Sequence, residues 1–142
     1  MVMYQGCLLL YIRYAMSENK YISEMHEDHR LWQSELLLAR DQLKSFQNRL
    51  SEVNMANTSK EIKAEIEKFQ NQFISEREVI DILMHDIRDD EFNLAKKVQE
   101  NNVATEHRKL EENTVLQERM KIFNKIFSDL GAKFTRFIAK TL

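Results

Sequence analysis

The chain has 142 residues, a formal net charge of −2 at pH 7, and 43% hydrophobic and 31% charged residues. This length fits a single domain, and a nearly balanced charge excludes a general attraction to nucleic acid or to anionic membranes. The single cysteine, Cys7, excludes an intramolecular disulfide and fits a reducing cytoplasm. With no proline and only two glycines, the chain lacks the turn residues that sheets require, so the composition predicts an all-α protein.

Residues 1–18 form an N-terminal extension to the predicted domain. Its apolar run from Cys7 to Ile12 is too short for a bilayer, which needs roughly 20 residues. A signal peptide is not predicted, because a basic leader is missing and Arg13 interrupts the apolar run. Either this segment extends the first helix backward, or translation starts at Met16, which a polar stretch follows. Residues 19–142 form the predicted helical domain.

The first predicted helix covers residues 19–53 and carries the longest apolar seam of the chain. Along this seam the apolar residues alternate steps of three and four, which is the pattern of a long packed helix. One polar residue, His29, lies within the seam. The seam consists of Ile22, Met25, His29, Trp32, Leu36, Ala39, Leu43, Phe46, Leu50 and Val53.

A second helix is predicted to follow a capping box formed by Thr58 and Glu61, and to end near residue 98. Its stripe consists of Ile62, Ile66, Phe69, Phe73, Ile80, Leu83, Ile87, Leu94 and Val98, with Glu76 as a polar member. Three large apolar residues, Ile74, Ile82 and Phe92, lie away from this stripe. They form either a second contact face or scattered surface positions.

The second turn is predicted at Asn101 and Asn102, where the stripe changes phase. A further irregularity is predicted near Asn113, because Thr114 and Gln117 have the spacing of another cap. The last helix has an apolar stripe that keeps its phase through Gly131. This stripe consists of Leu116, Met120, Phe123, Phe127, Leu130, Phe134 and Ile138.

Three amphipathic helices with short connections predict an antiparallel three-helix coiled-coil bundle. Each helix has one main apolar stripe, and three such stripes can close around one core. The alternative is a homodimer in which two chains share a core, which the length of the second helix would allow.

The histidines offer one candidate site. His26 and His29 are three residues apart, so they point the same way from a helix, and folding the chain back brings His85 and Glu118 near their level. Asp86 and Asp89 fall in the same layer. Imidazoles and carboxylates that meet in a bundle can hold iron, manganese or zinc. The predicted metal ligands are therefore His26, His29, His85 and Glu118; the alternative is a single core histidine, His29, that fixes helix register.

Two stretches carry a resemblance to known proteins. The spacing of His26, His29 and Trp32, followed later by His85-Asp86-Ile87, resembles that of small bacterial all-helical proteins of no assigned function. The first helix also resembles the histidine-rich first helix of hemerythrin-like bundles, although the later histidines of those proteins are missing here. These resemblances imply a helical bundle and no particular activity.

Function is constrained mainly by what the sequence lacks. It shows no glycine-rich phosphate loop and no nucleophile beside a histidine, so neither an enzyme nor a small-molecule substrate is predicted, and no cofactor beyond the metal alternative. The last helix is basic from Arg119 to Lys140, but cations near a helix C-terminus are usually a solvated face, so binding to nucleic acid or a membrane surface is not favoured. The remaining prediction is a cytoplasmic structural or interaction module that binds a protein partner or itself.

Overall fold

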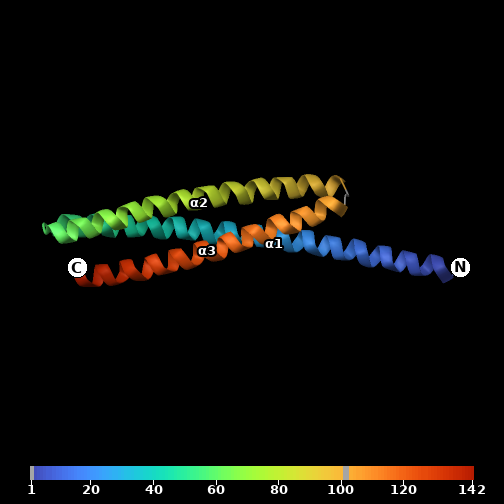
Figure 1. Cartoon of the computed structure of the whole chain (residues 1–142), viewed down its shortest axis with the longest axis horizontal. Helices are drawn as coiled ribbons and strands as arrows, with labels where there is room; N and C mark the ends of the chain where they lie inside the picture. The colour runs from blue at the N-terminus through green and yellow to red at the C-terminus, as the bar shows by residue number, and fades with distance from the viewer. Residues whose placement is uncertain (1, 101–102) are drawn as a thin grey trace.

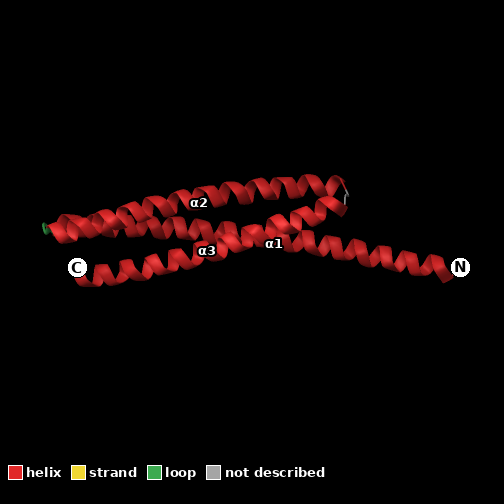
Figure 2. Cartoon of the chain, in the orientation of Figure 1, coloured by secondary structure: helices red, strands yellow, loops and turns green. Residues whose placement is uncertain are grey.

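The protein folds into three long helices. The computed structural model describes the backbone of residues 2–100 and 103–142, and the side chains of residues 22–96 and 111–142. Helix α1 covers Val2–Ala56, α2 covers Lys60–Glu100 and α3 covers Val103–Thr141. The three helices run up, down and up (Figure 1), and the described residues contain no strand (Figure 2). This arrangement confirms the predicted all-α three-helix bundle.

Helix α1 is longer than its neighbours. It contains 55 residues, which corresponds to about 80 Å of helix. Its N-terminal part continues beyond the turn that joins α2 to α3 (Figure 1). The helix therefore extends backward through most of the predicted N-terminal extension, whereas a translation start at Met16 stays a prediction.

The predicted seams of the three helices form the core. Residues such as Leu36 of α1, Ile80 of α2 and Met120 of α3 are almost completely buried. Glu76, the polar member of the α2 stripe, is half-buried, and burial raises its pKa. Some core positions differ from the prediction. Near the end of α3, Phe137 is buried and Ile138 only packs against the edge of the core, and Met84 of α2 is buried beside its stripe.

Phenylalanine rings fill the core at the end of the bundle near the α1–α2 turn. The Phe134 ring of α3 lies with its centroid 5.1 Å from both Phe46 of α1 and Phe73 of α2. Its centroid lies 5.4 Å from that of Phe69, also of α2, in an edge-to-face arrangement. Such geometries add favourable ring–ring contacts to apolar burial. The aromatic cluster therefore joins all three helices at this end.

The α1–α2 turn satisfies backbone groups that the helix ends leave free. The backbone N–H of Lys63 donates to the Ser59 carbonyl (3.0 Å), so α2 starts one residue later than the predicted cap at Thr58. The Asn57 side-chain amide donates to the Val53 carbonyl (2.9 Å) at the end of α1. Because carbonyls of the last helical turn have no partner within the helix, this contact helps to end α1.

The predicted irregularity near Asn113 is wrong, because α3 is continuous from Val103 to Thr141. Asn113 is 9% exposed and its side-chain amide donates to the Asp28 carboxylate of α1 (3.3 Å). It lies three residues before the buried Leu116, so the stripe continues through a polar member. The turn predicted at Asn101 and Asn102 falls between α2 and α3, and those two residues lie outside the described part of the chain.

Gly131 lies inside α3, as predicted, and its replacement should stabilise the protein. An added Cβ would lie 3.6 Å from Cζ and 3.8 Å from Cε2 of Phe46, which is ordinary contact. We expect Gly131→Ala to raise the free energy of unfolding by about 1 kcal/mol, because alanine has the higher helix propensity. Urea denaturation would measure this change. A lower stability would mean that the Phe46 ring cannot accept the methyl group.

Candidate functional site

Two histidines of α1 face two consecutive carboxylates of α2. We name His26, His29, Asp90 and Glu91 the histidine–carboxylate layer. His29 and Asp90 occupy seam positions and are 1% and 8% exposed, whereas His26 lies on the flank and is exposed. Because α2 runs antiparallel to α1, these residues from the two helices meet at one level of the bundle.

The Glu91 carboxylate bridges both histidines. Its Oε2 lies 2.5 Å from Nδ1 of His29, and its Oε1 contacts Nδ1 of His26. Oδ2 of Asp90 lies 2.9 Å from Nε2 of His29. This second contact has the distance of an ion pair but not the alignment of a hydrogen bond, since Nε2 has no partner of hydrogen-bond geometry. His29 thus lies between two carboxylates.

These contacts determine the charge of His29. Burial alone would lower the pKa of the imidazole, because it disfavours the charged form. The adjacent carboxylates of Asp90 and Glu91 outweigh this effect and raise the pKa above its ordinary value of 6.5. The arrangement therefore favours a protonated imidazolium that links α1 to α2 through the core.

Stability should depend on pH through His29. The pKa is higher in the folded than in the unfolded chain, so the stabilisation is complete below the unfolded value of 6.5 and is lost as pH rises through the folded value. We expect the free energy of unfolding, measured with urea from about pH 6 to about pH 9, to fall more steeply for wild type than for His29→Gln. Parallel curves for the two proteins would contradict this assignment.

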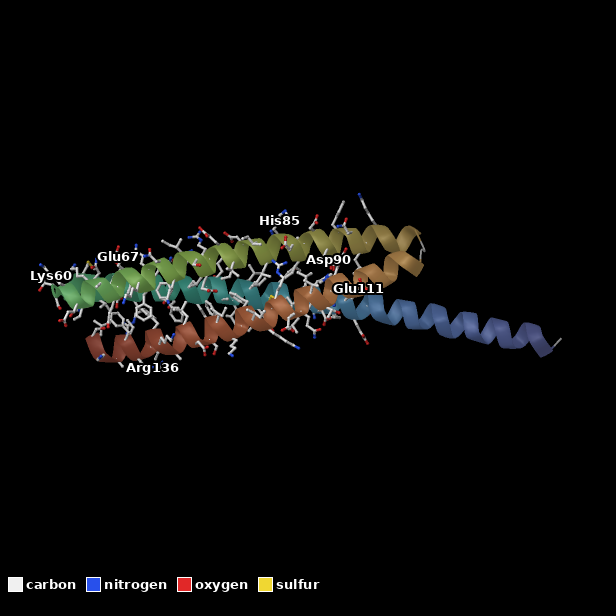
Figure 3. The ribbon with its side chains drawn as sticks, in the orientation of Figure 1. Lys60, Glu67, His85, Asp90, Glu111 and Arg136 are labelled. Atoms are coloured by element: carbon white, nitrogen blue, oxygen red, sulfur yellow. The ribbon has the colours of Figure 1, made fainter. Side chains whose placement is uncertain are left out.

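The other two predicted ligands do not join the layer. His85 is exposed on α2, points away from the bundle (Figure 3), and has its Nδ1 3.4 Å from Oδ1 of Asp86. Glu118 is exposed on α3 and has no contact with either α1 histidine in the described part of the chain. The Asp86 carboxylate accepts instead from Arg119 (2.8 Å), and this guanidinium lowers the Asp86 pKa.

Sequence reasoning placed Asp86 and Asp89 in this layer and missed the two carboxylates that form it. A signal for Asp90 was present, since it lies three residues after Ile87 and four before Leu94, both of which belong to the α2 stripe. That spacing assigns Asp90 to the core face of the helix. An acid at a core position needs a partner such as a buried histidine, because an unpaired buried charge is costly.

The layer does not have the geometry of a metal centre. Among residues 22–96 and 111–142, no group of three or more His, Cys, Asp or Glu side chains could hold a metal ion. The Nδ1 atoms of His26 and His29 both face the Glu91 carboxylate rather than a shared open position. The predicted iron, manganese or zinc site thus gains no support from the described geometry. The arrangement can hold a proton and fix the register of α1 against α2.

Comparisons with protein-family models, with curated proteins and with solved structures give no match for this chain. A separate observation concerns membranes: in the part of the chain that the structure describes, no helix has an apolar stretch long enough to cross a bilayer. Contacts and surface properties of this chain are therefore the basis for a functional proposal.

Proposed function

We propose that the chain is a non-enzymatic, cytoplasmic interaction module that binds a protein partner through one exposed surface of the bundle. The observation that carries this proposal is a strip of large apolar side chains on the outer edges of α2 and α3. We name it the apolar strip. Its members are between 36% and 59% exposed: Val79, Ile82, Val115, Ile122 and Ile126.

One contact and one shared cleft relate the levels of the strip on α2 to those on α3. Asp86 of α2 meets Arg119 of α3 at 2.8 Å. Farther along the bundle, Glu76 of α2 and Ile126 of α3 line one cleft. Val79 and Ile82 lie between these two levels on α2, and Ile122 lies between them on α3. The apolar side chains of the two helices therefore border the same interhelical groove.

A contiguous apolar strip indicates a binding surface more strongly than isolated apolar surface residues do. Single exposed hydrophobes are common on proteins, but an apolar patch that spans two helices marks an interaction site. Burying one isoleucine side chain contributes about 1.5–3 kcal/mol. A partner that covered the strip would gain several such contributions.

The three apolar residues that the sequence placed away from the α2 stripe do not form one face. Ile74, Ile82 and Phe92 are 48%, 56% and 60% exposed. Ile82 belongs to the apolar strip. At about 100° per residue, Ile74 and Phe92 point in one direction and Ile82 points roughly 80° away from it. Ile74 and Phe92 are therefore separate surface positions.

Site-specific photo-crosslinking in the native host tests the proposed function. A photoreactive residue at Ile122 should give a covalent protein adduct, because this position lies in the strip. The matched control is Lys121, the adjacent exposed position, which points to another side of α3. Equal adduct formation at the two positions, or none at Ile122, would overturn the proposal.

A further inference from the structure

Most of the apolar strip lies between two clefts of opposite charge, and its member Val115 lines one of them. Toward the α1–α2 turn, α2 and α3 enclose a cleft of about 550 Å³ with Phe69 and Phe137 in its wall. Glu65 is the one acid among its described lining residues. Its basic residues are Lys68, Lys133, Arg136 and Lys140. We name this cleft the basic end.

At the other end of the strip, α2 and α3 enclose a cleft of about 330 Å³. Arg119 is the one base among its described lining residues, and it already contacts Asp86. Its acidic residues are Asp86, Asp89, Asp90 and Glu112. We name this cleft the acidic end. The formal charges of these lining residues have opposite signs at the two ends, and Asp90 is buried against His29.

All these residues belong to two lines that border the α2–α3 groove. On α2 the line advances by steps of three and four from Glu65 to Asn93, and on α3 it does so from Glu112 to Lys140. Such steps keep residues on one edge of a helix. The ends are separated by about 30 Å, judged from Lys68 to Asp89 at 1.5 Å per residue. The surface is therefore an elongated face with a basic end, an apolar middle and an acidic end.

Some charges of the two ends form no ion pair in the described part of the bundle, whereas Asp86 pairs with Arg119 and Asp90 with His29. None of the four bases of the basic end forms an ion pair with another described side chain, and neither does Asp89 of the acidic end. Exposed lysines and aspartates next to an apolar strip can therefore pair with a partner without losing an existing contact.

Building on the proposed function, we infer that the partner is a second copy of this chain, docked antiparallel on the same face. A two-fold symmetric interface uses one surface patch twice, so the patch must complement itself. A half-turn about an axis through the middle of the strip places the basic end of each copy on the acidic end of the other. A parallel arrangement would instead bring like charges together, which costs several kcal/mol.

The sequence spacing sets the register of this dimer. Val79 and Ile126 lie at one level of the strip, and Ile82 and Ile122 lie at the next. When the two-fold axis passes between these two levels, the apolar middle of each copy covers that of the other. Lys133 lies seven residues beyond Ile126 on α3, and Asp89 lies seven residues beyond Ile82 on α2. The half-turn therefore brings Lys133 of each copy to the level of the partner's Asp89, across the α2–α3 groove.

The same axis gives a second charge pairing near the strip. Asp129 lies three residues from Ile126, and Arg119 lies three residues from Ile122 in the other direction along α3. The half-turn brings Asp129 to the level of the partner's Arg119. Asp129 is the acid that interrupts the basic side of the face, so this register gives it an opposite charge as well.

A charge exchange measured by sedimentation velocity tests the dimer. Lys133→Glu and Asp89→Lys should each weaken dimerisation by about tenfold or more, because each places two like-charge pairs in the symmetric interface. The double variant Lys133→Glu/Asp89→Lys restores opposite charges and should return to within about threefold of wild type. The control Lys121→Glu/Glu67→Lys makes the same exchange outside the face and should dimerise like wild type. Circular dichroism would verify that each variant is folded.

Two results would overturn the dimer. The first is a wild-type chain that stays monomeric up to about 1 mM, and the second is a double variant that dimerises no better than the single variants. Crosslinking at Ile122 separates this failure from failure of the proposed function. An adduct to a different protein, with a monomeric chain in solution, removes the dimer and keeps the interaction module. Absence of any adduct at Ile122 removes both.

Discussion

Replacing His29 by alanine is expected to lower the free energy of unfolding by about 3–5 kcal/mol. His29 is 1% exposed, and its loss removes the cation that lies against the buried carboxylate of Asp90. Removing one member of a buried ion pair is costly because water does not replace the lost interaction. The substitution also leaves a cavity beside Trp32, whose ring centroid lies 5.8 Å from that of His29.

Chemical denaturation of matched variants separates the charge effect from the loss of packing. His26→Ala removes the exposed histidine that shares Glu91 and should cost less than about 1 kcal/mol. The double variant His29→Leu/Asp90→Leu removes both buried charges and should recover most of the stability, since apolar residues can replace a buried ion pair. Equal losses for His29→Ala and His26→Ala would show that the buried pair does not stabilise the fold.

Replacing Phe134 by alanine should have an effect of similar size at the other end of the bundle. We expect a loss of about 3–5 kcal/mol, which is typical when a buried aromatic ring is removed from a core. Phe134 is 2% exposed and lies against rings of both other helices. Those rings belong to continuous helices, whose backbones cannot easily move inward to fill the space.

The matched control for this change is Phe92→Ala. Phe92 is 60% exposed, and its ring contacts Nζ of Lys96 at 4.8 Å from the ring centroid. Its loss should cost less than about 1 kcal/mol, because an exposed cation–π contact is weak. Thermal and urea denaturation would measure both variants. A Phe134→Ala protein as stable as Phe92→Ala would contradict the aromatic core.

Periodicity predicted the fold because each helix buries one stripe along the part whose side chains are described. Met25, Leu36 and Leu50 of the α1 seam are buried, and Phe46 is partly buried. The prediction failed near Asn113, where the cap-like spacing of Thr114 and Gln117 was interpreted as an irregularity although the helix is continuous. The contact of Asn113 with Asp28 makes it compatible with the core, and such a pairing between helices is not visible in either local sequence.

The candidate site was predicted only in part, for a related reason. The spacing of His26 and His29 along α1 is local, and it predicted that they point the same way. The shared group proposed from the sequence was a metal ion, whereas in the structure both face Glu91. Their partner on α2 depends on the length of the turn, and an error of one helical turn shifts the facing residue by about 5.4 Å. The sequence placed Asp86 in this layer, and the structure places Asp90 there, about one helical turn later. Glu118 was misplaced because its height on α3 depends on two turns.

The proposed interaction surface could not be predicted from the sequence alone. The basic residues of α3 were interpreted as a solvated helix face. Only the packing of α2 against α3 shows that Asp89 and Lys133 border the same groove on either side of the apolar strip. When two helices together form a surface with a basic and an acidic end, the sequence of either helix alone does not reveal it.

The most direct test of the histidine–carboxylate layer is a ¹⁵N NMR titration of the His29 imidazole in the folded protein. Two carboxylates hold this ring in the core, so both nitrogens should be protonated at pH 6.5, and the midpoint should lie above the ordinary value of 6.5. His26→Ala would assign the second signal of the layer. A neutral His29 ring, with one protonated nitrogen and a midpoint below 6.5, would contradict the account of a buried cation that joins α1 to α2.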